Sequence, residues 1–417
     1  MQISVRSFGA DKLVAFIVDP NEKIHSIQSK AACAFGKAPL ETRMVFRTEI
    51  LPCNVSLSDV GVKEGSELQL VIVPFQMLLT FSRDGTAKVW RTDIGECTIT
   101  FADRCPITRA VFNKDGSLML TASEDNTAKI WEIDTGKCKS SLNGHKKCVK
   151  SAVFDADCSR VLTASQDGTA KIWRTNTGEC INTLRGHRTP TAVLSAVFNS
   201  EGDRVLTASM DQTARIWRTD TGECTITLKG HRKDVNSAVF NPHDNGLVLT
   251  ASNDHNAKMW RSDTGECTIT LSGHRDWVKS AIFNVAGDLI VTASIDKNVR
   301  IWYTNNGECS TTLDGHIDNM HSAVFNLDGS LLLTGAKDNT VKVWRTDTGE
   351  CTVTLQGHKH RVHSAIFDTD GKLVLTASSD TTMKIWRTDT GKCTMTLHGH
   401  RDSVFSAVFS PQHVCTT

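Results

Sequence analysis

Residues 230–271 read GHRKDVNSAVFNPHDNGLVLTASNDHNAKMWRSDTGECTITL and contain four short strand patterns in succession. VNSAVF, LVLTAS, NAKMW and CTITL are rich in β-branched residues or alternate in polarity, as strands typically do. Clusters of Asn, Asp, Gly and Thr fill the connections, and these residues favour turns. No helical period runs through the stretch, so it predicts one four-stranded sheet.

This unit recurs along most of the chain. Eight tryptophans mark it at intervals of 41 to 44 residues: Trp90, Trp131, Trp173, Trp217, Trp260, Trp302, Trp344 and Trp386. A ninth tryptophan, Trp277, is out of register. Four strands in every unit of this length, without a helical period, predict four-stranded sheets repeated radially as a β-propeller.

The repeat resembles the WD-repeat family over roughly residues 76–410. Besides the tryptophans, the resemblance rests on seven Gly-His pairs, which end at His145, His187, His231, His274, His316, His358 and His400. It also rests on eight turn aspartates, Asp84, Asp125, Asp167, Asp211, Asp254, Asp296, Asp338 and Asp380. Each tryptophan is followed by Arg, Glu or Tyr rather than the family's Asp, but that position lies at the outer end of a strand. The resemblance therefore implies a mainly β protein with an eight-bladed propeller.

A His, a Thr, an Asp and a Trp recur in the units and superficially suggest a hydrolase triad. A nucleophile needs one site rather than a ring of them, so we expect no catalytic residues. In the resembled family these residues form a buried hydrogen-bond network. Two such sets are His400, Thr80, Asp84 and Trp90, and His145, Thr163, Asp167 and Trp173. Asp103-Arg104 replaces Gly-His in the second unit, where we expect an incomplete network.

The first unit lacks its opening strand. Residues 66–90, SELQLVIVPFQMLLTFSRDGTAKVW, run from an unrelated strand directly into the middle of a unit. A Gly-His loop and a strand, residues 404–409, stand alone near the other end and precede a tail at 411–417. We expect Val404–Phe409 to pair with Met77–Phe81 and close the ring, because closure removes exposed sheet edges. The alternative is a chain fragment or a mis-joined gene, with seven complete units and two remnants.

Residues 1–74 share nothing with the repeat and predict a small α+β domain. MQISV, KLVAFIV, TRMVF and ELQLVIV read as strands, and NEKIHSIQSKAACAFG reads as one amphipathic helix. The segment resembles ubiquitin, which implies a β-grasp fold. Its apolar partner-binding patch would map onto Phe8, Val45, Gln69 and Val71, with Gln69 in place of a histidine. No Gly-Gly end follows, so we expect a fixed ubiquitin-like module that docks partners; the alternative is that it only packs beside the propeller.

Composition narrows the class of protein. The formal net charge is +1, from 47 basic and 46 acidic residues, which argues against a nucleic-acid binder. No apolar run is long enough to span a membrane, and the N-terminus lacks a signal-peptide pattern, so we expect an intracellular protein, cytoplasmic or nuclear. Eight of the 14 cysteines recur with the repeat, and we expect them to be small buried side chains without a metal or redox role. We expect no cofactor.

In the resembled family, the loop after Gly-His and the turn before the repeat Asp share one face. Basic residues are frequent there, and they would suit acidic or phosphorylated peptides; the alternative is a mixed solvated surface. Trp277 stands where other units have Cys, Asp, Asn, Arg or Ser. We expect a protein-binding patch there, formed by Trp277, Ile295, Ile317, Arg275, Lys359 and Arg361.

These observations favour a non-enzymatic interaction scaffold or adaptor. In it the propeller would hold a protein client, while the ubiquitin-like domain would dock on ubiquitin-pathway or proteasome factors. The alternative is a scaffold of a large assembly, such as a ciliary, RNA-processing or signalling complex, in which the ubiquitin-like domain is only structural. An enzyme is disfavoured, because the sequence has no nucleotide-binding loop, metal-ligand cluster or unique nucleophile–base pair.

Overall fold

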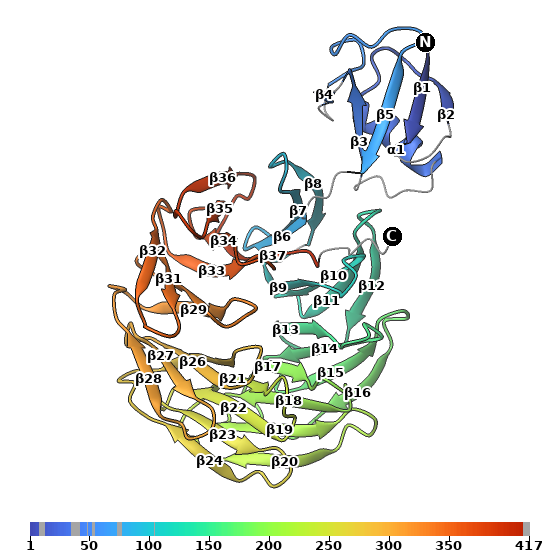
Figure 1. Ribbon diagram of the computed structural model, residues 1–417. Helices are drawn as coiled ribbons and strands as arrows, with labels where there is room; N and C mark the ends of the chain where they lie inside the picture. The colour runs from blue at the N-terminus through green and yellow to red at the C-terminus, as the bar shows by residue number, and fades with distance from the viewer. Residues whose placement is uncertain are drawn as a thin grey trace. The chain divides into compact units, whose positions relative to one another are not determined.

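The structure is a computed structural model that describes residues 1–417 except 8–12, 35–41, 48, 52–54, 73–76, 104 and 412–417. It divides into two compact units, Met1–Gln76 and Met77–Thr417 (Figure 1).

In the described residues, the N-terminal unit is a five-stranded mixed sheet with one helix. Its elements are β1 (Gln2–Ser7), β2 (Leu13–Ile17), α1 (Ile24–Ala34), β3 (Thr42–Phe46), β4 (Glu49–Ile50) and β5 (Glu67–Ile72). The strand order is β2-β1-β5-β3-β4, with β1 and β5 parallel and the other pairs antiparallel. Ile24, Ile27 and Ala31 of α1 are fully buried in the core of this unit because their spacing places them on one helix face.

The second unit consists of eight four-stranded antiparallel sheets, which confirms the predicted propeller of eight blades. Blade 1 contains β37 (Val404–Phe409), β6 (Met77–Ser82), β7 (Thr86–Arg91) and β8 (Cys97–Ala102). Blade 2 contains β9 (Ile107–Phe112), β10 (Leu118–Ser123), β11 (Thr127–Glu132) and β12 (Cys138–Asn143). Blade 3 contains β13 (Val149–Phe154), β14 (Arg160–Ser165), β15 (Ala170–Arg174) and β16 (Cys180–Leu184). Blade 4 contains β17 (Val193–Phe198), β18 (Arg204–Ser209), β19 (Thr213–Arg218) and β20 (Cys224–Lys229).

Blades 5 to 8 repeat the same order. Blade 5 contains β21 (Val235–Phe240), β22 (Leu247–Ser252), β23 (Ala257–Arg261) and β24 (Cys267–Leu271). Blade 6 contains β25 (Val278–Phe283), β26 (Leu289–Ser294), β27 (Val299–Tyr303) and β28 (Cys309–Leu313). Blade 7 contains β29 (Met320–Phe325), β30 (Leu331–Ala336), β31 (Val341–Arg345) and β32 (Cys351–Leu355). Blade 8 contains β33 (Val362–Phe367), β34 (Leu373–Ser378), β35 (Met383–Arg387) and β36 (Cys393–Leu397).

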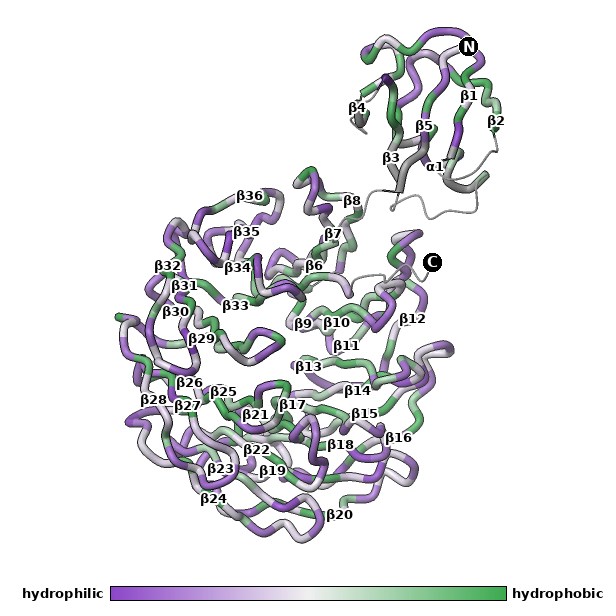
Figure 2. The backbone as a smooth tube through the Cα atoms, viewed as in Figure 1, coloured by the Kyte–Doolittle hydropathy of each residue, from purple (hydrophilic) through white to green (hydrophobic). Residues whose placement is uncertain are grey.

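The core of the propeller lies between successive blades. Leu249 and Ala251 of β22 pack with Val278 of β25 and with Trp302 of β27, so blades 5 and 6 share one hydrophobic cluster. Such a cluster recurs between neighbouring blades, and Figure 2 shows hydrophobic segments alternating with hydrophilic turns around the ring. The blades are therefore stabilised by their neighbours, as repeat units generally are.

The two ends of the propeller sequence meet in blade 1. β37 pairs antiparallel with β6 in a register that places Ala407 opposite Thr80, and in Figure 1 the red β37 lies beside the blue β6. Val404 and Ala407 are buried in a cluster with Leu78 of β6 and Leu375 of β34. β37 thereby supplies the innermost strand of blade 1 and part of its contact with blade 8.

The prediction that the repeated cysteines are buried is wrong. Each begins the outermost strand of its blade. Five are exposed, namely Cys97, Cys138, Cys180, Cys267 and Cys309. Three are half-buried, namely Cys224, Cys351 and Cys393. In β24, which begins with Cys267, the last residue, Leu271, is fully buried. The repeat shows that the cysteines are equivalent, but it does not show that their strand lies at the perimeter with only part of its residues facing the core.

Candidate protein-interaction face

A hydrogen-bond network ties loops to strands within the blades. In blade 3, His145 Nδ1 lies 3.0 Å from Asp167 Oδ2, and His145 Nε2 lies 2.7 Å from Thr163 Oγ1. The indole N–H of Trp173 donates to the same hydroxyl at 2.8 Å. A Cβ at Gly144 would lie 3.2 Å from the Trp173 ring, and Gly144 has φ 158°, which explains the glycine of the Gly-His pair. The set therefore holds the loop, strand and turn in one arrangement.

The aspartates of these networks are held ionised. Burial alone would raise the pKa of Asp167, but hydrogen bonds from His145, Thr169 and the Lys146 backbone outweigh it and hold this pKa well below its ordinary value. The polar groups of the histidine, threonine, aspartate and tryptophan side chains are hydrogen-bonded within the set. A buried structural network requires this.

Blade 2 has a different arrangement. Trp131 still donates to Thr121 Oγ1 at 2.9 Å. The Lys129 ammonium forms one salt bridge with the Asp103 carboxylate and another, at 3.0 Å, with the Asp125 carboxylate. Burial lowers the pKa of Lys129, but these two carboxylates outweigh burial and raise it. A lysine thus replaces the histidine as the partner of the turn aspartate; Arg104 lies outside the described residues.

We call the loop face the side of the propeller formed by the loops after the Gly-His pairs and by the turns that hold the repeat aspartates. In blade 6 these segments are residues 274–278 and 294–297. The Arg275 N–H donates to Asp296 Oδ2 at 2.9 Å, and the Ile295 N–H donates to the Trp277 carbonyl at 3.0 Å. The loop of blade 6 is therefore fixed to its own turn.

Trp277 is a large apolar side chain on this face that is 40% exposed. The Lys279 ammonium lies 4.6 Å from the centroid of its ring, a cation–π distance. Ile295 of the neighbouring turn is half-buried, and Ile317, at the start of the next blade's loop, is 79% exposed. The structure thus brings Trp277 and Ile295 together within blade 6, and places Ile317 on the loop face of blade 7.

The basic residues of the predicted patch are exposed but divided between blades. Arg275 belongs to blade 6, whereas Lys359 and Arg361 belong to blade 8. The Lys359 N–H donates to Asp380 Oδ2 at 2.9 Å, and Arg361 Nε donates to Ser379 Oγ at 3.1 Å. The Lys359 backbone and the Arg361 side chain are therefore both tied to the turn of blade 8.

Sequence reasoning missed a row of side chains inside the loop face. These side chains come from the second residue of the innermost strands β25, β29, β33 and β37, and they are Lys279, His321, His363 and Phe405. The ring centroids of His321 and His363 are 5.4 Å apart, and those of His363 and Phe405 are 5.3 Å apart. In the sequence, this position is the residue that follows the first apolar residue of each unit's opening strand. Its identity differs from unit to unit, and this variation was the available signal.

Grooves between blades at other places are products of the repeat. One of 730 Å³ between blades 7 and 8 is lined by Leu331, Leu373 and Asp389. Grooves of 450 and 460 Å³ lie between blades 4 and 5 and between blades 2 and 3, lined by corresponding residues. A feature that recurs between several blade pairs does not mark a single specific site.

The patch predicted on the N-terminal unit is only partly described. Val45 of β3 pairs with Gln69 of β5, and both side chains are half-buried. Val71 pairs with Arg43 in the same two strands, and Phe8 lies outside the described residues. The ubiquitin-like assignment and its docking role remain predictions.

Comparison with protein families places the repeat. The model for the WD domain, G-beta repeat (WD40) matches residues 95–132, 136–174, 178–218, 222–261, 265–303, 307–345, 349–387 and 391–415. Among solved structures, the computationally designed Ika8 protein is similar, with a TM-score of 0.64 and 27% identity over 71% of this chain and 88% of that chain. In all, 1659 chains of solved structures match, so the fold alone does not select a function. No curated protein matches.

Within the described part of the chain, no helix has the length and hydropathy needed to cross a membrane.

Proposed function

Since the chain belongs to the WD40 repeat family, we propose that it is a non-enzymatic protein-interaction scaffold whose loop face holds a protein or peptide partner. The observation that supports this most directly is Trp277, a tryptophan 40% exposed on a loop that is fixed to its own turn. Exposed tryptophan is typical of residues that dominate binding energy at interfaces. Ile317, 79% exposed on the neighbouring blade, is a second exposed apolar side chain on the loop face.

The networks support a scaffold rather than an enzyme. Each histidine with its aspartate and threonine is buried and engaged at both ring nitrogens, as His231 is by Asp254 at 2.8 Å and Thr250 at 2.7 Å. An engaged, buried imidazole that recurs in seven blades holds loops in place. Loops that are fixed before binding lose little conformational entropy when a partner docks, which favours affinity.

The strands provide matched controls for a binding test. β25 separates Trp277 on the loop face from Val285 beyond its other end, and Val285 is 49% exposed. We expect Trp277→Ala in the full chain to reduce the amount of captured partner proteins, measured by quantitative mass spectrometry, without lowering the melting temperature. Val285→Ser should leave capture unchanged. Equal capture by wild type and Trp277→Ala would refute the loop face as the binding site.

We further propose that the N-terminal unit docks on ubiquitin-pathway or proteasome factors. The support is the resemblance of its sequence to ubiquitin, together with its α+β sheet. Capture by the full chain should enrich such factors, and deletion of residues 1–72 should remove them while the clients of the propeller remain. If the deletion changes no partner, the unit is only structural, and a scaffold of a large assembly is the better description.

A further inference from the structure

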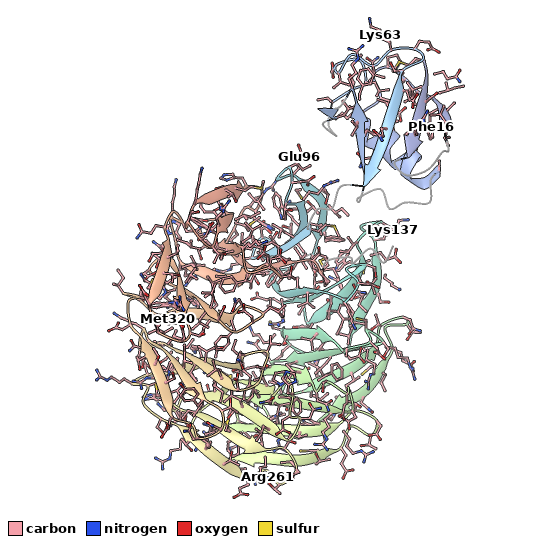
Figure 3. All side chains as sticks on the ribbon, in the orientation of Figure 1. Phe16, Lys63, Glu96, Lys137, Arg261 and Met320 are labelled. Carbon is pink, nitrogen blue, oxygen red and sulfur yellow. The ribbon has the colours of Figure 1, made fainter. Side chains whose placement is uncertain are left out.

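Two histidines lie against each other at the inner edge of the loop face. His321 is the second residue of β29 and His363 is the second residue of β33, so the pair bridges blades 7 and 8. Their ring centroids are 5.4 Å apart and the rings are inclined by 51°. Figure 3 labels Met320, which precedes His321 at the start of β29.

Both imidazoles are held neutral at pH 7. Burial and then the positive charges of Lys337 and Arg361 lower the pKa of His321 to about 4. Burial, His321 and Arg361 lower the pKa of His363 to about 4 as well. A titratable group whose pKa is strongly shifted by burial and by neighbouring charges is a candidate functional group, and positive surroundings attract a negative ligand.

The polar contacts of the pair are incomplete. His363 Nε2 lies 2.7 Å from Ser379 Oγ, and Arg361 Nε donates to the same oxygen at 3.1 Å. The hydroxyl therefore accepts from Arg361 and can donate to His363. Within the described part of the chain, His321 Nε2 is buried without a hydrogen-bond partner. Buried polar groups in proteins are nearly always paired, so this nitrogen lacks an interaction that a ligand can supply.

Positive charge outweighs negative charge around the pair. Among the charged groups of the described residues that act most strongly on His321, Lys337, Arg361 and Lys279 are positive and Asp318 is negative. Asp234 and Asp276 act instead on Lys279, whose ammonium lies above the Trp277 ring. The histidine pair therefore lies in a positive region that adjoins the exposed tryptophan.

From this arrangement we propose that His321, His363, Lys337 and Arg361 form an oxyanion site that receives the carboxylate or phosphate group of a partner peptide docked beside Trp277. The site rests on the proposed function and specifies the chemistry of the partner. Guanidinium and ammonium groups bind both kinds of oxyanion with charge-assisted hydrogen bonds. A neutral imidazole donates from one nitrogen, whereas an imidazolium donates from both.

An oxyanion in this site stabilises the protonated histidines. Binding therefore raises the pKa of His321 and of His363 and takes up protons. As a consequence, the affinity for a carboxylate ligand increases as the pH falls from 7.5 to 5.5, while the carboxylate itself stays ionised.

The test is a histidine NMR titration of the full chain with acetate or inorganic phosphate, and with sodium chloride at matched ionic strength. Resonances of the two histidines are assigned from the His321→Gln and His363→Gln variants. We expect acetate, phosphate or both to raise the two pKa values by about one unit relative to chloride. A response to acetate assigns the site to acidic side chains, and a response to phosphate assigns it to phosphorylated ones. Shifts no larger than those in chloride overturn the proposal.

Charge variants provide the second arm. Lys337→Gln with Arg361→Gln should abolish the difference between acetate or phosphate and chloride, whereas Arg261→Gln, at the outer end of β23 (Figure 3), should retain it. A difference that persists without Lys337 and Arg361 refutes the site. If the anion effect fails while capture of partners still depends on Trp277, the oxyanion site alone is wrong. If the anion effect holds while capture is indifferent to Trp277→Ala, the proposed function is wrong.

Discussion

His400 Nε2 lies 2.9 Å from Thr80 Oγ1, although the two residues are 320 positions apart in the chain. Asp84 Oδ2 lies 3.1 Å from His400 Nδ1, and Trp90 donates to Thr80 at 2.8 Å, so the network of blade 1 joins both ends of the propeller sequence. The strand that pairs with the closing strand β37 is therefore β6, at the other end of the propeller sequence. The stability of the ring depends on contacts that form only when the whole chain has folded.

Ala407→Asp tests this closure. Ala407 is 1% exposed in the cluster shared by blades 1 and 8, so the change buries a carboxylate without a partner. We expect the free energy of unfolding to fall by about 3 kcal/mol or more, measured by denaturant unfolding. Arg401→Ala, on the exposed loop before the strand, should change it by less than about 0.5 kcal/mol. An unaltered Ala407→Asp protein would show that β37 does not close the ring.

Thr163→Val tests the network of blade 3. The hydroxyl serves both His145 Nε2 and Trp173 Nε1, so its loss leaves two buried groups unsatisfied. Thr121→Val in blade 2 is the matched control, because that hydroxyl serves Trp131. We expect the Thr163 variant to lose about 2–4 kcal/mol in thermal unfolding and the Thr121 variant about half as much. Equal losses would contradict the role given to the histidine.

Lys129→Met tests the substitute arrangement in blade 2. The change removes the ammonium that faces the buried Asp103 and the turn aspartate Asp125. We expect a loss of roughly 3 kcal/mol, because breaking a buried ion pair leaves charge uncompensated. Lys258 occupies the equivalent place in blade 5 and donates to Thr270 at 2.8 Å in an exposed pair. Lys258→Met should therefore cost less than about 1 kcal/mol; a similar loss in both variants would show that Lys129 has no special role.

The pH dependence of stability follows from His321. Its pKa in the folded state is about 4, below its ordinary 6.5, so the unfolded state binds more protons between these values. Stability contributed by the neutral imidazole is complete above pH 6.5 and is lost as the pH falls toward 4. We expect His321→Gln to make the fall in unfolding free energy over this range shallower, whereas the exposed His243→Gln should not. An identical pH profile for His321→Gln and wild type would contradict the buried neutral state.

Much of the propeller could be predicted from sequence because its determinants repeat. The interval between Trp260 and Trp302 sets the blade length, and the four strand patterns set the order within a blade. The depth of a position was not predictable in the same way, which is why Cys267 was expected in the core and lies exposed on the outermost strand. Repetition shows that corresponding positions in different units are equivalent. The burial of such a position depends on whether its strand lies at the perimeter of the blade.

The site was predictable only where one residue broke the pattern. Trp277 stood out because it is a tryptophan outside the repeat. His321 and His363 did not, since each lies in a different unit and they meet only through the neighbouring strands β29 and β33. The environment that lowers their pKa values comes from a turn and a loop of two blades, and sequence spacing does not show that.

The most direct test of the interaction face is site-specific photo-cross-linking in the full chain. Ile317 and Leu327 flank opposite ends of β29 and are 79% and 66% exposed, so both accept a photoreactive amino acid with little effect on folding. The account predicts covalent partner adducts from position 317, on the loop face, and few from position 327. Adducts from position 327 alone, or equal yields from both positions, would contradict it.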